Sequence, residues 1–275
     1  MLKGLIGRFA RAQASIPDDL WDSTLRAVPF LARLNDDERV RLRVLAERLL
    51  GEKEMAGAAG LELTAAMQVH IAAQASLPIL NLGFEWYRGW SSIVVYPSEF
   101  LVPRSVTDDA GVVHEYTEPI SGEAWDGGPL LLSWEDAQLS NATDGAAYSV
   151  VIHEFTHKID LLNGDADGIP PFAPALHRNI GAADWQATLQ DAHETFIAEL
   201  ELVESELPAD VDPDSSDADR YYAHLPLDPY AAQDAGEFFA VSSETFFVEP
   251  ARLQAAFPHW YALLAAFFRQ DPLAP

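Results

Sequence analysis

The first part of the chain shows the helical spacing of apolar residues. A helix is expected to begin near Asn35-Asp36-Asp37-Glu38, which supplies a capping residue and an acidic first turn, and its apolar positions continue to Leu49. Residues 63–77 have the same spacing and predict a second helix. Residues 1–20 form a loosely amphipathic lead-in. We therefore expect residues 1–80 to be a helical region packed on the rest of the protein.

The spacing changes near residue 90, where short apolar runs separated by turn residues replace the helical period. Residues 92–97 read as a buried strand that is closed by proline. Residues 112–116 follow the turn signal Asp109-Ala110-Gly111, which predicts a hairpin or a meander. Residues 128–134 form a further apolar strand. These runs together predict a small β-sheet.

Helical patterns return in the second half of the chain. One helix is expected to begin at Gly145 or Ala146, after a polar loop. The other segments with helical spacing are residues 185–207, 236–247 and 257–268. The segment 236–247 is apolar almost all round, which is typical of a buried helix. Residues 185–222 are rich in Asp and Glu, and we interpret them as an acidic insertion.

These elements predict a mixed α+β fold with a small β-sheet and N-terminal helices. The 275 residues allow one large domain or two small ones. We expect residues 81–275 to form the main domain, on which the N-terminal helical region packs.

The formal net charge of −26 restricts the partners of this chain. A nucleic-acid backbone is bound by clustered Lys and Arg, so direct binding of nucleic acid is not expected. Anionic membrane surfaces are disfavoured for the same reason. The simplest interpretation of the charge is a soluble, self-repelling surface, and a preference for basic substrates is a weaker alternative.

The absence of cysteine restricts both the compartment and the metal chemistry. Disulfides and thiolate zinc sites are excluded, so any metal must use histidines and carboxylates. The N-terminal apolar run is broken by Gly and Arg and is too short for a signal-peptide core, and no later stretch resembles a membrane span. We expect a cytoplasmic protein.

Residues 153–157 contain His-Glu-x-x-His, the zinc signature of metallopeptidases. Residues four apart share one face of a helix, so His153 and His157 can direct their imidazoles at one ion. Glu154 is rotated from that line and can reach the water that zinc activates without being a ligand. The apolar flanks fit a buried helix, whereas the alternative is a helix that carries two histidines by accident.

Two histidines leave a catalytic zinc site one protein ligand short. The candidates downstream are His177, His193, His224, Asp228, Asp234, Glu237 and Glu244. Glu237 lies in the buried helix predicted for residues 236–247, where an unpaired carboxylate is costly and a metal removes that cost. A salt bridge or an acid at the helix N-terminus is the alternative role for Glu237. Glu244 is expected to support a ligand by hydrogen bonding, and Asp160 is expected either to do the same or to cap the helix.

Two other features have simpler interpretations than metal binding. His70 lies in the helix predicted for residues 63–77 and is expected to be an ordinary core or surface histidine. Residues 163–171 contain Asp-x-Asp-Gly, but the full register and the closing glutamate of a calcium loop are missing. A tight turn that uses Gly164 and Gly168 is the expected role of this segment.

Several segments together resemble the Mlc titration factor A family of zinc peptidases. They are GPLLLSW at residues 128–134, HEFTHKID at 153–160, NGDADGIPP at 163–171, DPYAA at 228–232 and EFFAVSSE at 237–244. The resemblance implies a zincin-like catalytic domain whose zinc ligands are His153, His157 and Glu237, with a catalytic core similar to that of anthrax lethal factor. In that core a tyrosine two turns before the ligand glutamate stabilises the transition state, and the matching residue is Tyr230. A buried core tyrosine is the alternative for that position.

The resemblance also implies an activity. Members of the family are described as peptidases, mainly aminopeptidase-like, and one member binds the glucose repressor Mlc. The sequence therefore predicts a zinc-dependent, aminopeptidase-like peptidase of the gluzincin type, with Glu154 as general base and Tyr230 as oxyanion helper. The strand within residues 130–134 is expected to be the edge that pairs with an extended peptide. The rival hypothesis is a zinc-containing regulatory protein that sequesters a transcriptional repressor.

Overall fold

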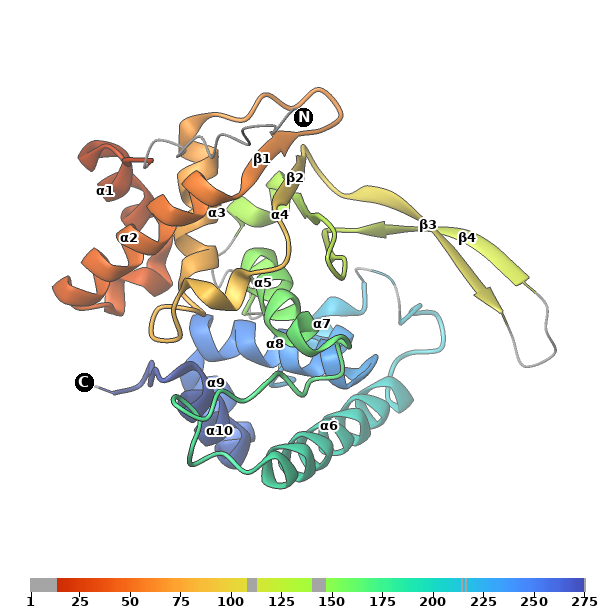
Figure 1. Ribbon diagram of the computed structural model, residues 1–275. Coiled ribbons are helices and arrows are strands. Elements are labelled where there is room, and N and C mark those ends of the chain that lie inside the picture. The colour runs from red at the N-terminus through yellow and green to blue at the C-terminus, as the bar shows by residue number, and fades with distance from the viewer. Residues whose placement is uncertain (1–13, 108–112, 140–146, 214, 216, 275) are drawn as a thin grey trace, which may run out of the picture.

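The computed structural model describes residues 14–107, 113–139, 147–213, 215 and 217–274. Figure 1 shows three N-terminal helices on one side of a small sheet, with helix α5 crossing the middle of the molecule. The C-terminal helices lie beneath α5, and a long hairpin projects away from the body. The predicted α+β fold is therefore confirmed.

The N-terminal part is helical, as the sequence predicts. Its elements are α1 (Asp18–Ala27), the 3-10 helix η1 (Pro29–Arg33), α2 (Asp36–Glu52) and α3 (Ala65–Ser76). Asn35 begins α2 with a capping box, in which its side chain accepts a hydrogen bond from the Glu38 amide and the Glu38 side chain accepts one from the Asn35 amide. The sequence pattern missed α1, which begins directly after Pro17 and buries Trp21.

The main sheet has four strands in the order β1-β2-β6-β5. Their bounds are β1 (Glu54–Gly57), β2 (Ser92–Tyr96), β6 (Leu130–Ser133) and β5 (Gly122–Ala124). β6 pairs parallel with β2 and antiparallel with β5, so the prediction that residues 130–134 form the free edge is wrong. The edge on that side is β5, a strand of three residues with no apolar run to reveal it. All four residues of β6 are buried, which is typical of an inner strand.

The projecting hairpin consists of β3 (Phe100–Thr107) and β4 (Val113–Ile120), which pair antiparallel. It confirms the hairpin predicted from the sequence, although the turn signal Asp109-Ala110-Gly111 lies outside the described residues. β4 leads through Ser121 directly into β5. The base of the hairpin therefore lies next to the free edge of the main sheet.

The motif helix α5 (Val150–Asp160) begins later than predicted. The predicted starting residues Gly145 and Ala146 lie outside the described residues, but Ser149 has an extended backbone and is not helical. Its hydroxyl accepts a hydrogen bond from the Ile152 amide at 3.2 Å, which makes Ser149 the N-cap. Every residue of α5 is buried.

The remaining helical elements are α4 (Trp134–Gln138), η2 (Phe84–Tyr87), η3 (Leu161–Asn163), α6 (Ala182–Ser205), α7 (Asp219–Tyr222), η4 (Pro229–Ala232), α8 (Ala235–Val248), α9 (Pro250–Ala256) and α10 (Pro258–Phe268). Two of them, η2 and α4, precede α5 in the chain, and the others follow it. The loop after α5 turns at Gly164 and Gly168, whose φ angles are 116° and 77°, as expected for glycines in tight turns.

Helix α6 belongs to the acidic segment, yet one of its faces is part of the core. Trp185 is fully buried, and its ring centroid lies 4.7 Å from that of Trp260 in α10. The hydrophobic core cluster extends from the N-terminal helices to α10. Within the described residues, no helix is long and apolar enough to cross a membrane.

Candidate metal centre

Helix α5 presents two imidazole nitrogens to the same point. The Nε2 atoms of His153 and His157 lie 3.1 Å apart, as their separation by four residues on a helix requires. Both side chains are almost fully buried. Two nitrogen atoms at this distance share a proton or a cation.

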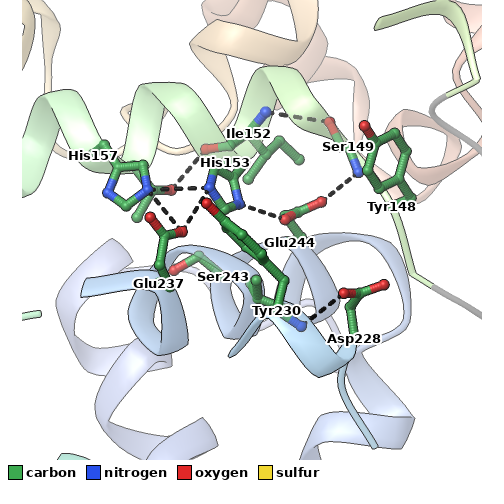
Figure 2. Close-up of polar contacts among 12 residues, drawn as sticks. Tyr148, Ser149, Ile152, His153, His157, Asp228, Tyr230, Glu237, Ser243 and Glu244 are labelled. Carbon is green, nitrogen blue, oxygen red and sulfur yellow. Dashed lines mark hydrogen bonds and ion pairs between the residues drawn. The ribbon is translucent and has the colours of Figure 1, made fainter. Parts of the chain in front are cut away.

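Helix α8 supplies the third group. Glu237 lies in its first turn, which Asp234 caps by accepting a hydrogen bond from the Glu237 amide at 2.9 Å. The Oε2 atom of Glu237 is 3.0 Å from His153 Nε2 and 3.2 Å from His157 Nε2. Figure 2 shows the carboxylate of Glu237 facing the two imidazoles across the gap between α5 and α8.

The dimensions of this triangle fit a small metal ion. Tetrahedral zinc with His and carboxylate ligands places neighbouring ligand atoms about 3.3 Å apart. The three distances here are 3.0–3.2 Å. Among the described residues, His153, His157 and Glu237 form the only group of at least three His, Asp or Glu residues with this geometry. The set contains no thiolate, which suits zinc or another divalent ion of the first transition row.

Glu244 fixes the orientation of the His153 ring. Its Nδ1 atom lies 2.8 Å from Glu244 Oε1 and donates to this carboxylate, so Nε2 is the nitrogen that faces His157 and Glu237. The other oxygen of Glu244 accepts a hydrogen bond of 2.6 Å from the Ser149 amide at the start of α5. Glu244 therefore joins α8 to both His153 and the N-terminus of the helix that carries it (Figure 2).

Burial and mutual contacts shift the pKa values of the polar groups in opposite directions. Burial raises the pKa of Glu237, but hydrogen bonds with His153 and His157 outweigh it and hold this pKa well below its ordinary value. Burial lowers the pKa of His153, but Glu237 and Glu244 outweigh it and hold this pKa well above its ordinary value. For Glu154 burial dominates and raises the pKa to about 7. A carboxyl group with this pKa can both accept and return a proton near neutrality.

Glu154 lies beside the triangle and is not part of it. It is 4% exposed, and its Oε2 atom has no hydrogen-bond partner among the described residues. A cavity of about 420 Å³ opens in front of it. The cavity is lined by residues of α5, α8 and β5 together with Asp228 and Tyr230.

Strand β5 approaches Glu154 closely at Gly122. A β-carbon at Gly122 would lie 2.6 Å from Glu154 Cγ, so only glycine fits while the carboxyl group keeps this position. Glu154 is thus enclosed by the strand on one side and faces the cavity on the other.

The family of the chain follows from comparison with known proteins. Residues 7–269 match the model of the glucose-regulated metallo-peptidase M90 family. The chain belongs to the M90 family. Its curated relatives include Mlc titration factor A of Yersinia enterocolitica, with 37% identity over 92% of this chain and 86% of the relative. The proteins of the same name in Salmonella arizonae and Serratia proteamaculans are 37% and 38% identical, over 93% and 92% of this chain and 92% and 88% of their own lengths.

Membership of the M90 family confirms the resemblance to Mlc titration factor A that the sequence segments indicate. It also gives the triangle of His153, His157 and Glu237 a natural interpretation, because the family is one of metallo-peptidases. The similarity of the catalytic core to that of anthrax lethal factor stays a prediction.

Tyr230 lies in η4, the element before α8. It is 46% exposed, so the alternative of a buried core tyrosine is wrong. Its ring centroid is 6.1 Å from that of His153, and its side chain extends from η4 toward His153 and Glu237 (Figure 2). The backbone amide of Tyr230 donates to Asp228 Oδ1 at 2.9 Å, which fixes the start of η4.

The other ligand candidates of this M90 chain lie outside the triangle. His177 is buried against Phe267, with its Nε2 atom 3.0 Å from the Phe267 carbonyl oxygen. His193 contacts the Ala232 carbonyl oxygen, and His224 is exposed. His70 is also a core residue, because its Nε2 atom lies 3.1 Å from the Ala137 carbonyl oxygen.

Asp160 supports the site indirectly. Its Oδ2 atom accepts a hydrogen bond of 2.7 Å from the Gly168 amide, so it fixes the loop after α5. Burial raises the pKa of Asp160 to about 7. The loop in turn packs on α8, since a β-carbon at Gly168 would lie 2.5 Å from the Ala235 carbonyl oxygen. Asp160 therefore helps to place the helix that carries Glu237.

Sequence reasoning missed two residues at this M90 site. Ser149 caps α5 and anchors Glu244, and the only signal for it was a serine before the apolar run of the motif helix. Gly122 contacts Glu154 from a strand that has no apolar period. The steric reason for this glycine becomes visible only when β5 and α5 are placed side by side.

Proposed function

We propose that this protein is a zinc-dependent peptidase with His153, His157 and Glu237 as ligands. The observation that supports this most is the triangle of ligand atoms 3.0–3.2 Å apart, with the buried carboxyl group of Glu154 next to it and facing a cavity. The matching family is named for metallo-peptidases, which agrees with this chemistry.

In this proposal Glu154 moves the protons. A bound zinc ion supplies Lewis acidity, which lowers the pKa of water toward neutrality and polarises a carbonyl. Glu154 accepts a proton from the attacking water at its free Oε2 atom and then gives that proton to the nitrogen of the leaving amine.

The surrounding residues prepare the reaction. Glu244 holds the Nδ1 proton of His153, which keeps the Nε2 lone pair directed at the ligand triangle. Tyr230 donates its hydroxyl proton in a hydrogen bond to the oxyanion that develops at the scissile carbonyl. β5 offers its free edge beside the cavity, where an extended peptide can add as a further strand.

We also propose that the substrates include peptides with a free N-terminus, as the aminopeptidase-like activity described for the family implies. Five residues with carboxyl groups line the cavity, namely Glu123, Glu154, Asp228, Glu237 and Glu244. No lysine or arginine is among the described lining residues. This excess of carboxyl groups over basic side chains favours a substrate with a positive charge.

Glu154→Gln tests the proposal directly. The variant keeps the size of the side chain but cannot accept a proton, so cleavage of peptides should fall by roughly 10²–10⁴-fold. Zinc content by elemental analysis and the melting temperature should stay near the wild-type values, because no ligand is removed. Chelation of the metal should abolish cleavage by the wild type, and addition of zinc should restore it. A Glu154→Gln protein that cleaves at the wild-type rate would rule out the mechanism.

A second candidate function rests on the name of the relatives, Mlc titration factor A. In this alternative the protein binds and sequesters a transcriptional repressor, and peptidase activity is incidental. A wild type that carries zinc and cleaves no peptide, yet binds a purified Mlc-type repressor tightly, would favour this alternative. Equal repressor binding by wild type and Glu154→Gln would show that the two functions are separable.

A further inference from the structure

Two buried lysines, Lys53 and Lys158, both place their ammonium groups over the indole ring of Trp90. Lys53 and Lys158 are 6% and 3% exposed, and their Nζ atoms lie 3.9 Å and 5.1 Å from the centre of the Trp90 ring. Neither lysine forms an ion pair with a described carboxylate. A buried ammonium group is costly unless other groups satisfy it, so each of these lysines needs a structural reason.

The Nζ atom of Lys158 is satisfied by backbone oxygens alone. It donates to the carbonyl oxygens of Trp125, Gly128 and Pro129 at 2.5, 3.0 and 3.4 Å. An ammonium group has three hydrogens, and here each has an acceptor. All three acceptors belong to the turn that joins β5 to β6.

The position of this turn constrains the position of β5. β5 has three residues and stands at the end of the sheet, with β6 as its pairing strand. Glu154 contacts β5 at Gly122, where the strand begins, and Lys158 binds the turn from Trp125 onward, where the strand has ended. Glu154 and Lys158 are four residues apart on α5 and so lie on one face of that helix. One face of α5 therefore contacts β5 at its beginning, through Glu154, and the turn just after its end, through Lys158.

We propose that Lys158 is a positioning residue that holds β5 against α5, so that the free edge of β5 receives the substrate backbone at the correct distance from Glu154. The inference about substrate rests on the proposed peptidase function, whereas the inference about β5 does not. Lys158 contacts neither the ligand triangle nor the reacting atoms. It acts through the β5–β6 turn.

Lys53 provides a matched control. It is a buried lysine over the same ring, and it donates to the carbonyl oxygens of Tyr87 and Trp90, the latter at 2.6 Å. Those acceptors lie before β2, which β6 separates from β5 in the strand order. Removal of either amine takes a similar group from a similar environment, but only Lys158 is bonded to the β5–β6 turn.

The experiment compares wild type, Lys158→Met and Lys53→Met as full-length, zinc-loaded proteins. Hydrogen exchange by mass spectrometry reports on the two segments separately. Lys158→Met should speed exchange in residues 121–129, and Lys53→Met should speed exchange in residues 87–96 instead. Unchanged exchange of residues 121–129 in Lys158→Met would overturn the structural part of the proposal, whatever the protein does to peptides.

Kinetics test the functional part. Zinc content should be unchanged in both variants. Lys158→Met should raise KM for an extended alanine- and lysine-containing pentapeptide, with a loss of roughly 10- to 100-fold in kcat/KM, because small misplacement at an active site is costly. A single-residue nitroanilide, which cannot pair along β5, should lose much less. Lys53→Met should lower the melting temperature with KM near the wild-type value.

The outcomes separate this proposal from the peptidase function. A wild type that cleaves neither probe counts against the peptidase function, and hydrogen exchange still decides the role of Lys158. A wild type that cleaves both probes, with equal KM for wild type and Lys158→Met on the pentapeptide, overturns the positioning role. If Lys158→Met does not fold, Lys158→Arg takes its place. The longer arginine side chain keeps the charge but displaces the turn. Lys158→Arg should therefore show the same selective loss of kcat/KM on the pentapeptide, with a smaller magnitude.

Discussion

The two walls of the cavity are built in different ways. The helical wall, α5 and α8, consists of buried side chains that hold one another, with Glu244 joining His153 to the start of α5. The strand wall, β5, consists of three partly exposed residues at the end of a sheet. Its placement depends on Gly122 against Glu154 and on Lys158 under the turn.

This difference separates two tasks. Ligand atoms must keep their distances to within tenths of an ångström, and a network of buried hydrogen bonds provides that rigidity. A wall that receives peptide backbone has to offer free N–H and C=O groups, so it cannot be fully paired in the free protein. We therefore expect changes in the helical wall to affect the metal first, and changes in the strand wall to affect the substrate first.

The largest effect is expected within the helical wall, from Glu237→Gln compared with Glu244→Gln. Glu237→Gln replaces an anionic ligand atom by a neutral amide, so most of the zinc should be lost and activity with it. Glu244→Gln keeps the three ligand atoms and weakens the support of His153, which should cost roughly 10–100-fold in metal affinity or activity. For both variants, elemental analysis measures the zinc content and competition with a chelator measures the zinc affinity.

If Glu244→Gln lost more zinc than Glu237→Gln, Glu244 would be the ligand and Glu237 would support it. The wild type should carry about one zinc per chain, as a single site with three protein ligands requires. Full zinc content in His153→Ala would contradict the whole assignment.

The helical wall could be predicted from the sequence and the strand wall could not. His153, Glu154 and His157 follow from the spacing of the helical motif, whereas the resemblance to the Mlc titration factor A family is what singles out Glu237 among the downstream candidates. β5 has no such signal, because three residues with one glycine show no period. The apolar run of β6 was mistaken for the edge, since β6 is buried by a neighbour that the sequence did not reveal.

Other expectations stay predictions because no observation here tests them. They are the cytoplasmic location, the division into residues 1–80 and 81–275, and the similarity to anthrax lethal factor. The start of α5 shows why boundaries are harder to predict than elements, since a single hydrogen bond from Ile152 to Ser149 sets it.

A smaller effect is expected for Tyr230→Phe, which tests a residue between the two walls. The variant removes one hydroxyl group from a side chain that is 46% exposed, so folding and zinc content should not change. If the hydroxyl binds the oxyanion mainly in the transition state, kcat should fall and KM should change little. A loss of about 10–100-fold is expected, because loss of one oxyanion donor costs roughly 10²–10³-fold in a fully enclosed site and less in an open one. A rise in KM at constant kcat would instead assign Tyr230 to substrate binding.

The smallest effect is expected for Gly122→Ala, where the two walls meet. The added β-carbon would lie 2.6 Å from Cγ and 2.7 Å from Cδ of Glu154, which is too close for either group to stay in place. Glu154 is 4% exposed but faces the cavity, so we expect its carboxyl group to tilt into the cavity and β5 to move outward until these contacts reach ordinary van der Waals distances. Cleavage should fall by about tenfold, because proton transfer depends on hydrogen-bond geometry, while the zinc ligands are untouched. Gly51→Ala is the matched control, since its nearest neighbour would be 3.9 Å away and alanine favours the helix that contains it. Equal rates for Gly122→Ala and Gly51→Ala would show that the strand wall does not position Glu154, whereas loss of zinc in Gly122→Ala would show that the two walls are not independent.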